Sequence, residues 1–267
     1  LKPLFARARK LGLPALGLSD EANLFALVKF YRAAQAAGVK PIIGTDVEVL
    51  EEGQPPLRFG LYCQHRDGYR NLSRLLTLAQ LKGREQGRAR VQAEWLREHA
   101  DGLIAVAVSS QAGLAQLLSQ QEDEAARALL EPWCAVFGDR LYVDLQRTGR
   151  TDHLVGGALD MALRLDLPVV ASNEVRFLDS EDFASNEARV CIHDGDRLDD
   201  ARRERRYTDQ QYLKSAEDMA ELFADIPSAL SNTVELARRC NLELEFGNNV
   251  LPDFPVPEGH TAASYIE

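Results

Sequence analysis

The sequence has few of the residues that build the most recognisable metal and redox sites. Its 267 residues contain 4 cysteines and 5 histidines. The cysteines, Cys63, Cys134, Cys191 and Cys240, lie far apart and form no CxxC pair, which excludes a zinc-ligand spacing and a disulfide framework. No two histidines stand at HxH or HxxxH spacing. We therefore expect reduced, mostly buried thiols, as in a cytoplasmic protein.

Other signals are also absent. No apolar run reaches the ~18 residues that span a membrane, and no signal peptide is visible. There is no phosphate-binding P-loop, no GxGxxG turn and no serine nucleophile elbow. The net charge of −10, from 31 basic and 41 acidic residues, argues against a nucleic-acid-binding surface. One dense basic run, Arg202, Arg203, Arg205 and Arg206, is expected to be a solvated loop.

Short apolar segments alternate with amphipathic ones along most of the chain. The expected strands are residues 15–18, 41–49, 58–63, 103–108, 141–145 and 168–172. Buried strands separated by helices indicate a parallel sheet, and the lack of a GxGxxG turn favours a barrel over an open nucleotide-binding sheet. After Leu178 the pattern is mostly helical.

In a parallel barrel the functional side chains lie at the carboxyl ends of the strands. Carboxylates are common there, at Asp20, Glu21, Asp46 and Glu174. Four converging carboxylates could hold a hard cation such as Mg²⁺ or Mn²⁺. Alternatively, the strand-end arginines, such as Arg147, could neutralise them in ion pairs. The residue types alone leave both possibilities open.

Several segments carry a resemblance to a known family, in order and with similar spacings. They read GLSDEANLFALVKFYRAAQAAGVKPIIGTDVEV, QHRDGYRNLSRLL, LYVDLQRTGR, ASNEVRFLDSEDF, YLKSAEDMAELFADIPSALSNTVELARRC and LPDFPVPEGH. Together they resemble the PHP (polymerase and histidinol phosphatase) domain of bacterial replicative DNA polymerase III alpha subunits. The resemblance implies a distorted (β/α)7 barrel of the TIM type with a helical C-terminal extension. It also implies that the first strand, with an HxH motif, would precede Leu1, so that the chain is part of a longer protein.

In active relatives, His, Asp, Glu and Cys side chains at the strand ends bind a metal cluster that hydrolyses phosphoesters. The resemblance places the corresponding positions at Asp20, Glu21, Asp46, Arg58, Ser109, Thr148, Glu174 and Arg176. Glu21, Arg58, Thr148 and Arg176 replace histidines of the family pattern, and Ser109 replaces a cysteine. A guanidinium has no lone pair for a metal and stays protonated, so Arg58 and Arg176 would pair with the carboxylates instead. We therefore predict vestigial metal-site positions, no catalytic residue, no cofactor and no phosphoesterase activity in this domain.

The resemblance further implies a domain over residues 1–250, followed at 251–267 by a proline-rich linker and the start of a helix leading to a polymerase palm domain. The parent chain would be a DNA-directed DNA polymerase, a nucleotidyltransferase, with its catalytic carboxylates beyond Glu267. The expected partners are the proofreading exonuclease subunit, the palm domain of the same chain and other replicase subunits. DNA would be contacted mainly by domains outside residues 1–267, and no membrane is expected.

Two alternatives remain. The first is an active metal-dependent phosphoesterase or 3′–5′ exonuclease with a reduced Mn, Zn or Mg site made by Asp20, Asp46, Glu174 and His193. For His193, which stands beside Gly195, a helix carboxyl terminus is the simpler interpretation. The second alternative is a barrel enzyme that acts on a small phosphorylated metabolite. The orientation of Arg58 and Arg176, toward the ring of strand ends or toward solvent, separates the degenerate site from the active one.

Overall fold

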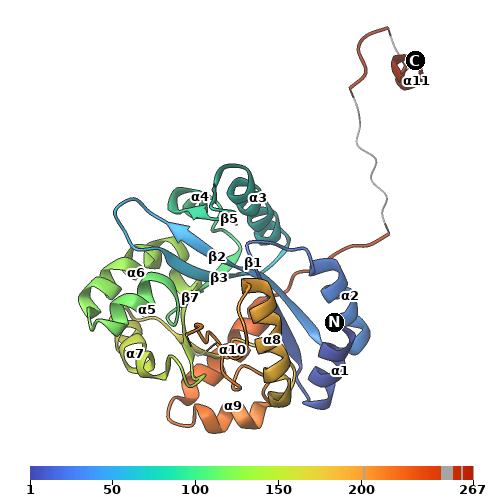
Figure 1. Ribbon diagram of the computed structural model, residues 1–267. Helices are drawn as coiled ribbons and strands as arrows, with labels where there is room; N and C mark the ends of the chain where they lie inside the picture. The colour runs from blue at the N-terminus through green and yellow to red at the C-terminus, as the bar shows by residue number, and fades with distance from the viewer. Residues whose placement is uncertain (201, 248–254, 260, 267) are drawn as a thin grey trace.

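A curled mixed sheet forms the centre of the molecule in the computed structural model, which describes residues 1–200, 202–247, 255–259 and 261–266 (Figure 1). The sheet order is β1-β2-β3-β7-β8-β9. These strands are β1 (Ala15–Glu21), β2 (Lys40–Leu50), β3 (Leu57–Cys63), β7 (Leu103–Val108), β8 (Leu141–Gln146) and β9 (Val169–Ser172). Short strands complete the set: β6 (Val91–Gln92) pairs with β2, and β4 (Arg84–Glu85) pairs with β5 (Arg88–Ala89).

Helices cover the outer face of this sheet and continue after its last strand. They are α1 (Lys2–Lys10), α2 (Leu27–Ala37), α3 (Arg66–Lys82), α4 (Ala93–Glu98), α5 (Ala112–Ser119), α6 (Asp123–Phe137), α7 (Val155–Arg164), α8 (Phe183–Asp194), α9 (Ala216–Leu222), α10 (Pro227–Arg239) and α11 (Ala262–Ile266). Three 3₁₀ turns, η1 (Gly138–Arg140), η2 (Asp152–Leu154) and η3 (Ser180–Asp182), lie between them. The helices α8 to α10 are the helical extension that the sequence predicts. Of the predicted linker, residues 251–254, 260 and 267 lie outside the described residues, and the boundary at 250 stays a prediction.

The direction of β3 differs from the parallel arrangement that we expected. It runs antiparallel to both β2 and β7. Only residues 51–56 separate β2 from β3, too few for a crossover, so the two strands form a hairpin. The amino end of β3 therefore lies beside the carboxyl end of β2, with Arg58 opposite Glu48 and Gly60 opposite Asp46. This reversal brings Arg58 to the same end of the sheet as the carboxylates.

The distorted barrel expected from the sequence is confirmed as a curled sheet that stays open on one side. Among the described residues β1 pairs with β2 alone and β9 with β8 alone, so the two edges face each other unpaired. A groove of about 940 Å³ lies along this opening and the inner face of the sheet. We call it the β1–β9 groove; its lining includes Leu16, Ile42, Val106 and Val170.

The central strands β7 and β8 are buried on both faces. Along β7, Leu103, Ala105 and Ala107 belong to the large core under the outer helices, whereas Ile104 and Val106 belong to a smaller inner cluster. This division follows the alternation of side chains along a strand. The inner cluster also contains Tyr142, Leu236 and Cys240, of which Leu236 lies on α10.

Helix α10 closes the end of the half-barrel where the parallel strands begin. Lys40, the first residue of β2, donates hydrogen bonds from Nζ to the carbonyl of Ala237 (2.7 Å) and to Oδ1 of Asn241 (2.8 Å). The opposite end, where β1, β2, β7, β8 and β9 finish, remains accessible. The side chains of interest lie at that end.

Candidate functional site at the carboxyl ends of the strands

The first part of the site joins β1, β2 and β3. Glu21 closes β1 directly beside Asp46 in the sheet register. Asp46 is three-quarters buried, and its Oδ1 accepts a hydrogen bond from Ser19. Loss of water on burial raises the pKa of Asp46, and the Ser19 hydrogen bond and Arg58 oppose that rise. Asp46 is therefore a carboxylate whose charge depends on its neighbours.

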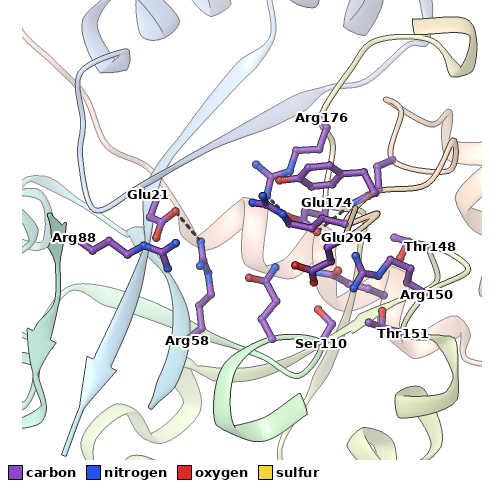
Figure 2. A pocket seen from close by; sticks show the side chains of 15 residues that line it. Glu21, Arg58, Arg88, Ser110, Thr148, Arg150, Thr151, Glu174, Arg176 and Glu204 are labelled. Atoms are coloured by element: carbon purple, nitrogen blue, oxygen red, sulfur yellow. Dashed lines mark hydrogen bonds and ion pairs between the residues drawn. The ribbon is translucent and has the colours of Figure 1, made fainter. Parts of the chain in front are cut away.

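Arg58 supplies the positive charge at this place. Its Nη2 lies 3.5 Å from Oδ2 of Asp46 and 3.8 Å from Oε2 of Glu21. Its side chain is only 15% exposed, so it folds into the ring of strand ends rather than toward solvent. In Figure 2 the contact with Glu21 is drawn as a dashed line.

A second ion pair follows β9. Arg176 Nη2 donates to Oε1 of Glu174, and the guanidinium lies 5.1 Å from the centre of the Tyr207 ring. The other oxygen of Glu174, Oε2, accepts a hydrogen bond of 3.0 Å from Gln211, whose side chain is buried. Both arginines thus make the ion pairs expected of them, whereas Arg147 turns away and binds Asp225 with two hydrogen bonds of 2.7 and 2.6 Å.

The sequence analysis missed Asp144, which lies on β8 with 4% of its surface exposed. Its Oδ2 accepts hydrogen bonds from Gln146 (2.7 Å) and Ser172 (2.9 Å). Its Oδ1 is buried and has no hydrogen-bond partner among the described residues. Burial raises the pKa of Asp144 to about 7, and the neighbouring negative charges of Asp46 and Glu174 contribute to the rise. The available signal was an aspartate inside the otherwise apolar segment LYVDL.

The remaining predicted positions do not add ligand atoms to the site. Ser109 is buried, and its hydroxyl donates to the backbone carbonyl of Asp144 (2.6 Å). Thr148 is buried, and its carbonyl accepts a hydrogen bond from the hydroxyl of Thr208 (2.6 Å). Asp20 lines the β1–β9 groove and makes no ion pair with any described residue.

His193 does not join the carboxylates. It lies near the end of α8, its side chain is 86% exposed, and its Nδ1 lies 2.9 Å from Oδ1 of Asp194. It lines neither the β1–β9 groove nor the arginine pocket described next. The structure therefore does not bring together the reduced ligand set of Asp20, Asp46, Glu174 and His193.

Beside the ion pairs lies a smaller cavity of about 340 Å³. Five arginines and three glutamates line it: Arg58, Arg88, Arg150, Arg176, Arg206, Glu21, Glu174 and Glu204. We call it the arginine pocket. In Figure 2, Arg58, Arg88 and Glu21 lie on one side of it, and Arg150 lies on the other with Thr148, Thr151 and Glu204. Arg206, from the basic run, also binds Asp194.

The basic run is a loop in which Arg202, Arg205 and Arg206 are exposed, as we expected, but Arg203 departs from that expectation. Arg203 has 6% of its side chain exposed, and its Nη2 donates a hydrogen bond of 2.6 Å to Glu187 on α8, itself 7% exposed. Arg202 pairs with Asp200 at the surface. Arg203 folds inward because it pairs with this buried carboxylate on the preceding helix. The spacing of the basic residues did not predict that partner.

The donors at the strand ends do not fit a metal cluster. Within residues 1–200, 202–247, 255–259 and 261–266, no group of three His, Cys, Asp or Glu side chains is placed to hold a metal ion. Arg58 lies against two of the carboxylates that such a cluster would need, and Arg176 holds a third. At the strand ends, Asp144 keeps one buried carboxylate oxygen that has no hydrogen-bond partner among the described residues.

Comparison with known proteins gives three findings on sequence. A sequence model of the PHP domain matches residues 1–148. The DNA polymerase III subunit alpha of Pseudomonas aeruginosa is 44% identical over 271 residues, covering 100% of this chain and 23% of the relative. The corresponding subunits of Xylella fastidiosa and Escherichia coli K12 are 46% and 40% identical over 98% and 97% of this chain, covering 22% and 23% of their own lengths. The chain thus spans less than a quarter of these curated relatives.

Among solved structures, a protein from Bifidobacterium adolescentis assigned as a metal-dependent phosphoesterase is similar with a TM-score of 0.42 and 15% identity. The match covers 64% of this chain and 80% of that one. In the part of the chain that the structure describes, we find no helix with the length and apolar character needed to cross a bilayer.

Proposed function

Because the chain belongs to the PHP domain family, we propose that it serves DNA replication as the PHP domain of a bacterial DNA polymerase III alpha subunit. The observation that supports this is identity of 40–46% to such subunits over nearly the whole chain. Polymerase activity, a nucleotidyl transfer, would then belong to the larger part of the parent protein. We expect it in the cytoplasm, where the bacterial chromosome lies.

Within that subunit we propose that the domain no longer hydrolyses phosphoesters. The observation that supports this is Arg58, whose guanidinium lies between Asp46 and Glu21 at 3.5 and 3.8 Å. A second metal ion that used Glu174 as a ligand would compete with Arg176, which already binds that carboxylate. Fixed positive charges in these places repel divalent cations and offer no lone pair to them.

We propose instead that the domain supports the polymerase palm domain and docks the proofreading exonuclease subunit. The acidic net charge of −10 suits protein partners better than template DNA. Other replicase subunits would bind through the parent chain, and DNA would be contacted mainly elsewhere. The test is calorimetric titration of the 267-residue chain with the purified exonuclease subunit. Saturable one-to-one binding is expected, and its absence at protein concentrations of roughly 50 μM would refute docking by this domain alone.

The second candidate is an active phosphoesterase or 3′–5′ exonuclease with a reduced metal site. One observation favours it: the uncommitted Oδ1 of the buried Asp144, whose pKa responds to the charge of Asp46. A carboxylate without a partner is a donor that a cation could use. The active phosphoesterase is the second candidate because no metal-binding group of three residues is found among the described residues.

An activity assay separates the two candidates. The chain is incubated with Mn²⁺, Mg²⁺ or Zn²⁺ and with single-stranded DNA ends or a chromogenic phosphodiester, beside the variant Asp46→Asn. Under our proposal any hydrolysis is equal in both proteins and comes from contaminants. Hydrolysis by the wild-type chain that disappears in Asp46→Asn would establish the second candidate.

A further inference from the structure

Three large apolar side chains are exposed where α2 begins and α3 ends. Phe25 is 89% exposed, Leu81 77% and Val28 46%. Nε2 of Gln80 donates a hydrogen bond of 3.2 Å to the carbonyl of Ala22, so the last turn of α3 lies beside the loop between β1 and α2 (Figure 1). We call the three apolar side chains the α2–α3 surface. Exposed apolar groups that gather in one place mark interaction sites more often than scattered ones do.

The loop that carries Phe25 is held in one conformation. Nδ2 of Asn23 donates to the carbonyl of Glu21 (2.8 Å), and Oδ1 of Asn23 accepts from the backbone N–H of Phe25 (3.0 Å). On either side of the exposed ring, Leu24 packs against the large core and Leu27 belongs to it. The Phe25 ring therefore projects from a fixed loop, and a partner that binds it has little backbone to order.

The charge around this surface is opposite to that of the whole chain. Residues 22–45 and 68–84 contain no Asp or Glu, although the net charge of the chain is −10. Lys29 lies in the first turn of α2, and Arg74 and Lys82 lie in the second half of α3. All three are exposed, and none makes an ion pair with a described residue. Cations without a carboxylate partner thus accompany the apolar side chains.

We propose that the α2–α3 surface binds an acidic protein segment that carries apolar anchor side chains. An apolar centre with a charged rim is the usual arrangement of a protein interface, and aromatic residues often act as its anchors. The unpaired cations would attract and orient carboxylates of the partner. Single-stranded nucleic acid would instead need aromatic rings on which bases stack, and two of the three apolar side chains, Val28 and Leu81, are aliphatic.

This surface is separate from the site at the strand ends. None of Phe25, Val28 and Leu81 lines the β1–β9 groove or the arginine pocket. A protein bound at the α2–α3 surface would therefore leave the ion pairs of the strand ends in place. The inference goes beyond the proposed function, because it assigns a partner chemistry to a surface that has no part in the former metal site.

Peptide display tests the partner chemistry. A random peptide library on phage is selected on the 267-residue chain and depleted on the variant Phe25→Ser, so that only binders of this surface remain. We expect the enriched peptides to combine aspartate or glutamate with aromatic or leucine side chains. One enriched peptide is then synthesised with a fluorescent label and titrated by anisotropy. Failure to enrich any peptide, or enrichment of neutral or basic ones, would overturn the proposal.

Two further variants, which play no part in the selection, test the surface itself. Leu81→Ser should weaken the labelled peptide at least about tenfold, as loss of an interface anchor does. Lys82→Gln should weaken it about threefold at low ionic strength and reduce its salt dependence. Both side chains are exposed, so the variants should fold normally. Unchanged affinity in Leu81→Ser would overturn the proposal.

Leu163→Ser and Arg238→Gln are the matched controls. Leu163 is 70% exposed on α7, and Arg238 forms an exposed pair with Glu235 on α10, both outside the α2–α3 surface. Each should change the affinity less than about twofold, because distant exposed groups are screened and make no contact. Equal weakening by the controls would overturn the assigned surface.

Two other occupants are distinguished in the same experiments. A labelled single-stranded oligonucleotide that binds the wild-type chain but not Phe25→Ser or Leu81→Ser would overturn the proposal in favour of nucleic acid. A dimer in sedimentation that dissociates in Phe25→Ser would overturn it in favour of a second copy of this chain. None of these outcomes depends on whether the exonuclease subunit docks.

Discussion

Asp144 carries a carboxyl group into the interior of the half-barrel, where a negative charge is poorly solvated. Its side chain makes no ion pair with any described residue, and its two hydrogen-bond donors, Gln146 and Ser172, are neutral. Burial of an unpaired carboxylate costs free energy, and the group responds by holding its proton to higher pH. Its pKa of about 7 means that the charge of the inner face changes near neutral pH.

This predicts a pH-dependent effect of the variant Asp144→Asn. The pKa rises from 3.8 in the unfolded chain to about 7 in the folded one, so the folded state binds the proton more tightly. The wild-type protein therefore loses stability as pH rises from about 4 to about 7, and the variant lacks this loss. Relative to wild type, the free energy of unfolding of the variant should rise by on the order of 3 kcal/mol over this pH range, as measured by urea unfolding. A stability difference that does not vary with pH would show that Asp144 is ionised throughout.

The variant Arg58→Gln should expose the carboxylates that Arg58 neutralises. Asp46 and Glu21 then face each other without the guanidinium of Arg58, and the pKa of Asp46 rises further. We expect a loss of about 1–2 kcal/mol in the free energy of unfolding at pH 7. The loss should shrink toward pH 4, because the raised pKa of Asp46 lets this group take up a proton and lose the charge that Arg58 neutralises. Arg238→Gln, which breaks an exposed pair, should cost no more than about 0.5 kcal/mol.

At the residue scale the sequence predicted the ion pairs of Arg58 and Arg176 but not Asp144. Arg176 follows from its place after the last strand, whereas Arg58 was predicted only from the family resemblance, because it stands at the start of its strand. Asp144 sits within β8, where side chains alternate between the two faces, and the segment alone does not say that both faces are buried. Only the packed structure shows that its inward side faces Asp46 and Glu174.

At the element scale, the direction of β3 decides the composition of the site. The apolar pattern located this strand correctly, because buried strands are recognised by composition. Direction is not encoded in that pattern, and the short connection of residues 51–56 was the only clue. Had β3 been parallel, Arg58 would lie at the opposite end of the sheet from Asp46. The position of Arg58 beside Asp46 thus depends on this hairpin.

Helix α3 also packs closely against the turn before β7. A Cβ added at Gly68 would lie 1.9 Å from the carbonyl oxygen of Gly102, which itself has a φ of +69°. Gly68→Ala should therefore destabilise the protein by about 2 kcal/mol, because backbone must move. Gly156→Ala in α7 is the control: no atom lies within 4 Å of its added Cβ, and alanine favours a helix. Thermal unfolding should show a lower midpoint for the first variant only; equal midpoints would refute the close packing.

At the scale of the whole molecule, the central sheet is open on one side. The sequence predicted a barrel from alternation, and the structure has the curled sheet with β1 and β9 unpaired among the described residues. Unpaired strand edges can accept another strand, and the β1–β9 groove offers an apolar lining beside them. Helix α10 closes only the opposite end, so the ion pairs and the arginine pocket stay reachable.

The central claim is that this domain has exchanged a metal cluster for ion pairs. Elemental analysis of the purified 267-residue chain, dialysed without chelator, tests it most directly, with Asp46→Asn as the matched variant. We predict less than about 0.1 equivalent of Mn, Fe or Zn in both proteins, since a retained metal needs a fitted set of ligands. One equivalent or more in the wild-type chain that is lost in Asp46→Asn would contradict the claim and place a metal ion at the strand ends.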